Sequence, residues 1–279
     1  HISAQKGEKM FGKDATNAMI KEIKQLLKEK KAIHPVYANS LSKRQLKKRI
    51  RSLMFLKPKF DAMGRFEKIK ARLVANGAQQ DRNLFDDLSS PTAATMSVFI
   101  ILAIAATERR KTATIDVTGA YLNADMTGET VVMELDALVT RIVTKVAPDA
   151  KQYMDERGRM LVVLDKALYG CVQSAKLWYE NVCKFLQSIG YVANDVDPCI
   201  MNKMVNDKQC TIALFVDDIL ITCEDEAGID QLIESLRSEY GDITVHRDPV
   251  DLSYIGMHLH TEGNKIKVSQ LAYITELLT

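Results

Sequence analysis

The sequence is short of the features that mark membrane, secreted and disulfide-rich proteins. Its longest apolar stretch, Val98 to Ala106, is far below the ~20 residues that a membrane span needs. The first residues lack the charged-then-apolar pattern of a secretion signal. Five cysteines form no Cys-x-x-Cys pair and have no His at metal spacing, which favours buried reduced thiols over disulfides or a zinc site. We therefore expect an intracellular protein without a membrane segment; its 47% hydrophobic and 27% charged residues suit one or two globular domains.

The net charge is only +2 over 279 residues, but the charged residues are unevenly distributed along the chain. Residues 1–72 carry 20 Lys and Arg against 6 Asp and Glu, a balance of +14, and the remainder carries 18 against 30, a balance of −12. A basic first quarter is the electrostatic surface expected for a polyanion such as nucleic acid. A solvated Lys-rich helix face explains the same charge, and charge alone favours that plainer explanation.

Two apolar runs rich in β-branched residues meet at adjacent carboxylates within residues 211–222. The pattern predicts a hairpin of two buried strands with Asp217 and Asp218 at its tight turn. Asp116 lies near the end of another β-branched run and is costly to bury unless it is paired or holds a metal. Hard Mg²⁺ takes carboxylate oxygens, and a pair of such ions clamps the attacking and leaving oxygens of phosphoryl transfer. These three aspartates could form a two-metal site, although Asp is also an ordinary turn residue.

Elsewhere the periodicity predicts alternating helices and strands. Helices are expected over residues 14–31, 42–49 with Ser42 as N-cap, 91–110, 226–240 and the second half of 161–189. The third of these is apolar enough that we expect it to be buried. Strands are expected over residues 52–59, 66–74, 131–135, 198–204 and 242–246, with a hairpin from residue 254 to 269. His258 and His260 alternate onto one face of that hairpin, where a solvated face is favoured over a metal site because no third ligand is evident.

Seven short strings occur in the order seen in reverse transcriptases of copia-type LTR retrotransposons. They lie at residues 70–74 (KARLV), 90–92 (SPT), 116–123 (DV and AYLN), 166–170 (KALYG), 178–179 (WY), 215–218 (FVDD) and 254–256 (YIG). From about residue 52 to its end the sequence resembles that family. The resemblance implies an α+β fold, that of a right-hand polymerase whose antiparallel palm sheet is covered by helices on one face. It assigns residues 1–88 and 128–160 to the fingers, 89–127 and 161–260 to the palm, and 261–279 to the start of a truncated thumb or connection.

The resemblance further implies an RNA-directed DNA polymerase, a nucleotidyltransferase in which a primer 3′-hydroxyl attacks the α-phosphate of a dNTP. Asp116, Asp217 and Asp218 would be catalytic, and together with Val117 they would bind two Mg²⁺ ions, with Mn²⁺ as an alternative. The implied partners are an RNA template, a DNA primer or RNA/DNA hybrid, and dNTPs, with RNase H and integrase segments adjacent in the full polyprotein. The implied location is a cytoplasmic virus-like particle, with nuclear entry also open.

By the same resemblance, Lys70 and Arg72, which share one strand face, would contact the triphosphate. Tyr121 would stack under the sugar and exclude a 2′-hydroxyl, although a plain core tyrosine fits its sequence context nearly as well. The other substrate positions are Tyr169, Gly170, Gln173 and Phe215, and the positions that would grip the primer end are Tyr254, Gly256 and Met257.

Two other functions fit parts of the sequence. A non-catalytic nucleic-acid-binding protein derived from a retroelement would use the basic first quarter and would not need the three aspartates. A different palm-type phosphotransferase, such as a cyclase, would use the aspartates but would leave the strings at residues 70–74 and 254–256 unexplained.

Overall fold

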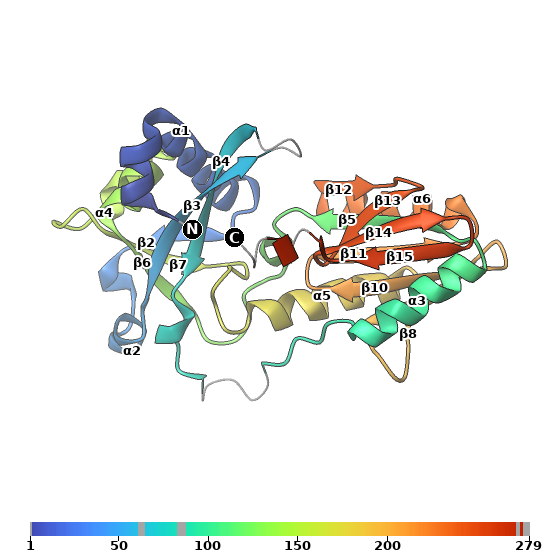
Figure 1. Ribbon diagram of the computed structural model, residues 1–279. Coiled ribbons are helices and arrows are strands. Elements are labelled where there is room, and N and C mark those ends of the chain that lie inside the picture. The colour runs from blue at the N-terminus through green and yellow to red at the C-terminus, as the bar shows by residue number, and fades with distance from the viewer. Residues whose placement is uncertain (1, 61–64, 83–87, 272–273, 276–279) are drawn as a thin grey trace. The chain divides into compact units, whose positions relative to one another are not determined.

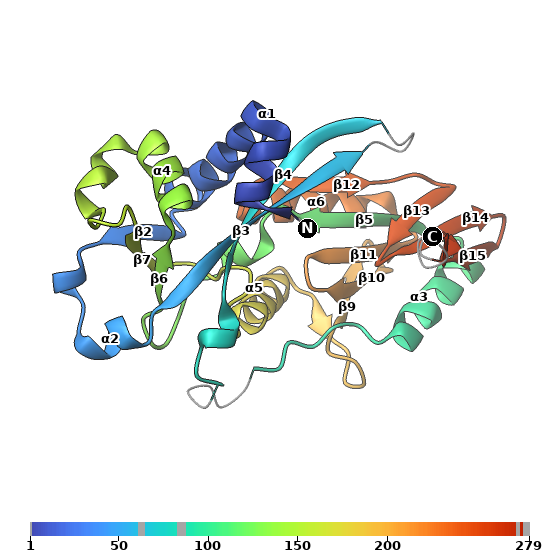
Figure 2. The same ribbon diagram turned by 60° about the vertical axis from the view of Figure 1, so that its left-hand side comes forward.

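The computed structural model describes residues 2–60, 65–82, 88–271 and 274–275, and the chain divides into two compact units (Figures 1 and 2). Unit 1 comprises His1–Leu88 and Tyr121–Trp178, and unit 2 comprises Ser89–Ala120 and Tyr179–Thr279. Both units mix helices and strands, which confirms the predicted α+β class. The predicted borders between fingers and palm, after residues 88, 127 and 160, follow function rather than compactness and stay a prediction.

Unit 1 is built on a six-stranded sheet with the order β1-β3-β6-β7-β2, in which β4 also pairs with β3. The β3–β6 pair is parallel and the other pairs are antiparallel. Helix α1 packs against α4, β3 and β4, as Figure 1 shows. The strands are β1 (Ile2–Ser3), β2 (Ile33–Val36), β3 (Ile50–Phe60), β4 (Phe66–Ala75), β6 (Val132–Leu135) and β7 (Met160–Leu164). The helices are α1 (Ala4–Lys24), η1 (Gln25–Glu29), η2 (Ala38–Ser40), α2 (Lys43–Lys47), η3 (Gly77–Gln79), α4 (Ala137–Val146) and η6 (Pro148–Tyr153).

The first helix begins earlier than the sequence predicted. A helix was expected from Asp14, but α1 starts at Ala4 and continues into the π-helix η1, with a break at Gly12, whose φ is +51°. Ser3 caps it, and its side chain accepts a hydrogen bond from the Lys6 amide. The predicted apolar face is confirmed, because three of its members have no exposed surface: Met19, Ile23 and Leu26.

Two shorter expectations in unit 1 are confirmed. Ser42 is the N-cap of α2 and forms a capping box with Gln45, in which each side chain bonds to the main chain of the other residue. The hairpin β3–β4 forms with the predicted strands, while residues 61–64, the expected connection, lie outside the described residues.

Unit 2 contains a fully antiparallel six-stranded sheet with the order β12-β5-β11-β10-β9-β8, which confirms an antiparallel sheet, while its assignment as a polymerase palm stays a prediction. A second antiparallel sheet consists of β13, β14 and β15, of which the sequence analysis missed the first strand. The strands are β5 (Lys111–Val117), β8 (Val192–Ala193), β9 (Ile200–Val205), β10 (Lys208–Phe215), β11 (Asp218–Cys223), β12 (Ile243–His246), β13 (Asp251–Tyr254), β14 (Met257–Glu262) and β15 (Lys265–Ser269). The helices are α3 (Thr95–Thr107) and α6 (Glu226–Tyr240); η5 (Ala120–Asn123) and α5 (Ser174–Ser188) run from one unit into the other.

Helices cover both faces of the large sheet, where the sequence predicted one. Gly228 of α6 lies so close to the Cys210 and Cys223 sulfurs that a Cβ there would be 2.1 Å from the first. Thr211 and Thr222, the next residues along β10 and β11, face the opposite side because side chains alternate along a strand. They line a hollow of about 430 Å³ together with residues of α3. Two covered faces explain why both apolar runs are buried along almost their whole length.

Helix α3 differs from its prediction in start and in burial. It was expected from Pro91 but begins at Thr95, because the main-chain amides of Ala93 and Ala94 donate to Leu214 O and to the Asp197 carboxylate, each at 2.9 Å. The helix was also expected to be buried, but one side of it is exposed at Met96 (67%), Phe99 (42%), Ile100 (55%) and Ile104 (40%). Among the described residues, no helix is both long and apolar enough to span a membrane.

Candidate active site

The predicted hairpin is confirmed, with Asp217 in its turn and Asp218 as the first residue of β11 rather than a second turn residue. Strands β10 and β11 pair from Thr211 opposite Thr222 to Phe215 opposite Asp218, which leaves Val216 and Asp217 as the two turn residues. Val216 has a φ of +58°, the sign that a type II′ hairpin turn needs at its first central position, where glycine is usual. A β-branched side chain in this conformation costs of order 1–3 kcal/mol, so the surrounding hairpin must hold the tip in place.

Asp116 lies directly beside that tip. Strand β5 is antiparallel to β11 with Asp116 opposite Asp218, and the Val117 amide donates to Asp217 O at 3.3 Å. Side chains of directly opposed residues lie on one face of a sheet, with Cβ atoms about 5 Å apart. One end of the sheet therefore brings Asp116 close to Asp217 and Asp218, which come about a hundred positions later in the sequence.

The three carboxylates interact electrostatically. The pKa of Asp218 is raised from 3.8 to about 6, first by burial and then by the negative charges of Asp217 and Asp116. The charges of Asp217 and Asp116 therefore make the charged form of Asp218 less favourable, which a bound cation would relieve. Within the described ranges, no group of three or more His, Cys, Asp or Glu side chains is already arranged as a metal site.

A second cluster lies in unit 1 and joins three of the predicted substrate positions. The Tyr121 and Tyr169 rings are tilted against each other with centroids 4.5 Å apart, and the Arg72 guanidinium carbon lies 4.2 Å from the Tyr169 ring centroid. We call these three residues the Arg–Tyr–Tyr stack. Lys70 is exposed on the same face of β4 as Arg72, as predicted. No local sequence pattern predicts the stack itself, because its members come from three separate segments.

The turn after β7 contains two further predicted positions. Gly170 has a φ of +92°, and a Cβ there would lie 2.0 Å from Ala75 O, so the close main-chain approach requires glycine. The Gln173 side chain is 5% exposed. Its oxygen accepts from Gln80 Nε2 at 3.0 Å and its amide lies 3.1 Å from Met126 Sδ. Gln173 thus ties the turn to its own unit, and its contact with substrate stays a prediction.

The predicted primer positions divide between surface and core. Gly256 is exposed, whereas Tyr254 is 2% and Met257 4% exposed. The Tyr254 hydroxyl donates to Ala213 O in β10 at 3.0 Å, and burial raises the pKa of this tyrosine. Phe215 is half-buried at the end of that strand. Tyr254 therefore supports β10, the strand that leads into the Asp217 turn, a structural role that sequence reasoning missed.

His258 and His260 share a strand face as predicted, with a carboxylate between them. Asp251 Oδ1 lies 2.9 Å from His258 Nε2 and 2.8 Å from His260 Nδ1. Asp251 is the third polar group. It was not predicted because β13, the strand that carries it, was not predicted.

Comparison with known proteins gives a consistent result. The model of a family described as "Reverse transcriptase (RNA-dependent DNA polymerase)" matches residues 40–279. A retrovirus-related Pol polyprotein from transposon TNT 1-94 of Nicotiana tabacum is 30% identical over 80% of this chain and 16% of that polyprotein. The corresponding polyprotein from transposon RE1 of Arabidopsis thaliana is 25% identical over 79% and 14%, and the Ty1-NL2 Gag-Pol polyprotein of Saccharomyces cerevisiae is 26% identical over 61% and 9%. The chain thus spans less than a fifth of the length of these relatives.

Proposed function

The chain belongs to the reverse transcriptase family of copia-type retrotransposons, and from this membership we propose that it extends a primer on a template by two-metal nucleotidyl transfer. The observation that carries the proposal is the convergence of Asp116, Asp217 and Asp218 at one end of the sheet in unit 2. These residues come from two separate parts of the chain, so ordinary turn chemistry explains the hairpin pair but not the third carboxylate beside it.

The donor set fits a hard divalent cation. Carboxylate oxygens are the ligands that Mg²⁺ prefers, and Val117 adds a main-chain oxygen next to Asp116. Burial, followed by the negative charges of Asp217 and Asp116, raises the pKa of Asp218, and a cation would favour its charged form. Asp116, Val117, Asp217 and Asp218 would hold two Mg²⁺ ions, or Mn²⁺, and the side chains would close around the ions as they bind. When bound, such ions activate the primer 3′-hydroxyl and neutralise charge on the phosphates.

The residues of unit 1 would hold the incoming dNTP. Arg72 presents a guanidinium that the Tyr169 ring orients, and Lys70 adds a second cation on the same strand face. Preorganised cations of this kind stabilise the charge that develops on a leaving pyrophosphate. Tyr121 would lie against the sugar and exclude a 2′-hydroxyl, with Tyr169 fixing the angle of its ring.

The relatives are named Pol and Gag-Pol polyproteins, which supports the proposal that this segment acts on nucleic acid as part of a longer polyprotein. The remaining parts are proposed without such support. The template would be RNA, the primer DNA or an RNA/DNA hybrid, and RNase H and integrase segments would accompany this one in the full product. The reaction would take place in a cytoplasmic virus-like particle. The basic first quarter of the chain, with a balance of +14 over residues 1–72, would contact the nucleic acid.

The proposal is tested by extension of a DNA primer on an RNA template with dNTPs and Mg²⁺. We expect extension by the wild-type protein and by Asp195→Asn, a control at an exposed aspartate of unit 2. We expect none by Asp217→Asn, with an unchanged circular dichroism spectrum. Extension by Asp217→Asn near the wild-type rate would refute the assignment. Absence of extension in all three proteins, with salt-sensitive binding to the template retained, would favour the non-catalytic nucleic-acid-binding alternative.

A further inference from the structure

The three-stranded sheet of unit 2 carries two histidines on its central strand. His258 and His260 lie on β14, which pairs with β13 on one side and with β15 on the other (Figure 1). Their neighbours Met257 and Leu259 face the opposite side of the sheet and are 4% and 3% exposed. Main-chain pairing on both sides and a buried opposite face therefore fix the positions from which the two imidazoles leave the sheet.

A carboxylate from β13 lies between the two rings. Asp251 is directly opposite His260 in the β13–β14 pair. Its Oδ1 atom lies 2.9 Å from His258 Nε2 and 2.8 Å from His260 Nδ1. The centroids of the two rings are 6.4 Å apart, and the ring planes differ by 27°. Three atoms that can bind a metal, from two strands, thus converge on one face of the sheet.

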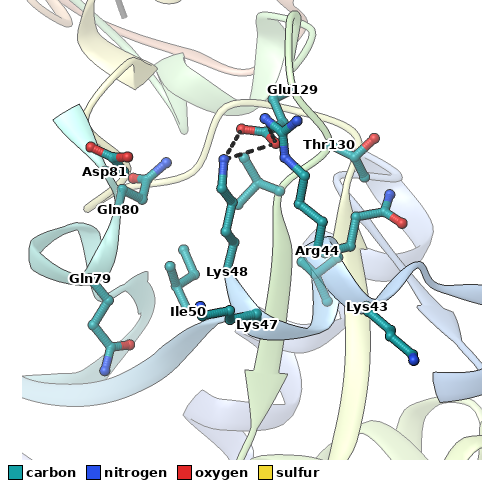
Figure 3. Close-up of a pocket in the computed structure, with 13 residues that line it drawn as sticks. Lys43, Arg44, Lys47, Lys48, Ile50, Gln79, Gln80, Asp81, Glu129 and Thr130 are labelled. Carbon is teal, nitrogen blue, oxygen red and sulfur yellow. Dashed lines mark hydrogen bonds and ion pairs between the residues drawn. The ribbon is translucent and has the colours of Figure 1, made fainter. Parts of the chain in front are cut away.

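This arrangement differs in chemistry from an ordinary network of ion pairs. In unit 1 the Glu129 carboxylate also lies between two nitrogen groups, 3.0 Å from Arg44 Nη2 and 3.1 Å from Lys48 Nζ (Figure 3). The protonated nitrogens of lysine and arginine have no lone pair for a metal. A neutral imidazole has one, and imidazole is the commonest metal ligand in proteins. The His258–His260 group can therefore exchange its hydrogen bonds for metal bonds once each ring proton moves to the other nitrogen, which the Glu129 group cannot do.

The group needs only a small rearrangement to hold an ion. Around a tetrahedral ion with metal–ligand distances of about 2.0–2.2 Å, neighbouring ligand atoms lie about 3.4 Å apart. The two distances from Asp251 Oδ1 are ~0.5 Å shorter than this, because hydrogen bonds now join the atoms. For this reason the group is not already arranged as a metal site, like every other group among the described residues. The three side chains are between 39% and 51% exposed, so they have room to turn apart and to admit water as a further ligand.

The charges on this face of the sheet do not oppose a cation. Lys267 is opposite His260 in β15, but its Nζ atom donates to Glu262 Oε2 at 2.5 Å, so a carboxylate offsets its charge. The remaining cross-strand neighbours on this face are Ser253, Lys265 and Ser269. Two lysines therefore face two carboxylates, and no excess of positive charge repels an ion from the histidines.

We propose that His258, His260 and Asp251 bind a divalent transition-metal ion such as Zn²⁺ through two imidazole nitrogens and one carboxylate oxygen, with water completing the coordination. Two nitrogens and an oxygen suit Zn²⁺, Ni²⁺ and Cu²⁺, whereas Mg²⁺ takes oxygen ligands and keeps several waters. The site therefore differs in chemistry from the carboxylates of Asp116 and Asp217, and it does not depend on the proposed function.

A bound ion would tie together two strands of the small sheet. Asp251 is the first residue of β13, and Tyr254 is its last, with a hydroxyl that donates to Ala213 O in β10 at 3.0 Å. A ligand that binds only the folded protein raises its free energy of unfolding. Zn²⁺ should therefore stabilise unit 2, which gives the site a measurable effect other than catalysis.

The test is isothermal titration calorimetry of the untagged, metal-free protein with ZnCl₂, in a buffer with Mg²⁺ in large excess. We expect one Zn²⁺ ion to bind per chain. His258→Gln and His260→Gln should each weaken binding at least tenfold, because each removes a ligand, and Asp251→Asn should weaken it about tenfold. The matched control is His34→Gln, which removes an exposed histidine whose Nδ1 atom lies 2.6 Å from the carboxylate of Asp165. This control removes a single histidine beside a carboxylate and should leave the affinity within twofold.

A second variant and a second measurement separate this site from the proposed catalytic ions. Asp217→Asn should keep its Zn²⁺ affinity within twofold. Zn²⁺ should raise the midpoint of urea unfolding of the wild type and of Asp217→Asn, but not that of His258→Gln. Equal losses of affinity in His258→Gln and His34→Gln, or an unchanged affinity in Asp251→Asn, would overturn the proposal. Loss of Zn²⁺ binding in Asp217→Asn would place the ion at the other carboxylates and would overturn it as well. Because neither measurement needs turnover, failure of the proposed polymerase would appear in primer extension and not here.

Discussion

Replacing Asp218 by Asn should stabilise unit 2 while it weakens the proposed reaction. The pKa of Asp218 is raised from 3.8 to about 6, a shift of about 2 units, which corresponds to about 3 kcal/mol. The side chain is half-exposed, so solvent screening reduces this to about 1–2 kcal/mol. Asn keeps the shape of the side chain and removes its charge, so the variant should gain about this amount in free energy of unfolding at pH 7.5.

The sign of the pH dependence follows from the raised pKa. Below pH 3.8 the carboxyl is protonated in both the folded and the unfolded protein and costs nothing. Between pH 3.8 and about 6 the folded protein binds more protons, so its stability falls as the pH rises, and above pH 6 the full cost is present. The gain of Asp218→Asn at pH 5 should therefore be about half of the gain at pH 7.5.

Urea unfolding followed by far-UV circular dichroism, with EDTA present, measures this gain. Asp195→Asn serves as the control. Asp195 is exposed and distant in sequence from the aspartates of the hairpin, so this substitution should give no gain in free energy of unfolding. Addition of Mg²⁺ should reduce the advantage of Asp218→Asn, since the ion would neutralise the wild-type carboxylates. An equal gain at pH 5 and pH 7.5, or no gain at all, would contradict the raised pKa that burial and the neighbouring negative charges give Asp218.

Three other substitutions test contacts described above. Tyr169→Phe should leave the KM for dNTP within twofold, because stacking needs only the ring. Tyr169→Leu should raise that KM about tenfold and increase ribonucleotide incorporation. Equal effects of the two substitutions in primer extension would rule out a role for the stack. Tyr254→Phe should lower the free energy of unfolding in urea by about 1 kcal/mol, through the hydrogen bond lost to β10, and an unchanged value would deny that bond any net contribution. Gly170→Ala should cost about 2 kcal/mol or more in the same assay, since φ is +92° and the added Cβ meets main chain; a cost near zero would mean that the turn adapts freely.

The large sheet and the Asp hairpin were predictable because their signals are local. Strands β5, β10 and β11 are rich in β-branched apolar residues, and the two carboxylates lie at the break between two such runs. Helix α6 was predicted to the residue, since Asp225 supplies a local cap and Gly241 a local stop.

Two of the failures involve partners that are distant in sequence. Helix α3 begins only at Thr95 because Leu214 O and the Asp197 carboxylate accept the amide hydrogens of Ala93 and Ala94, and nothing near Pro91 in the sequence signals those acceptors. The Arg–Tyr–Tyr stack likewise joins segments far apart in the chain, so only the structure could find it. The exposed side of α3 was missed because apolar composition predicts burial on average and does not identify which side is covered.

The positive φ of Val216 has a consequence for how copies of this sequence would change over many generations. Glycine at position 216 would relieve the strain of the hairpin tip by about 1 kcal/mol, so it is available as a stabilising substitution at any time. Glycine would also free the tip that carries Asp217 to adopt other backbone conformations. Copies that are retained for their chemistry should therefore keep a branched residue at position 216. Copies that drift without selection should accumulate glycine and other residues there. The residue at position 216 would then mark elements that have lost their activity.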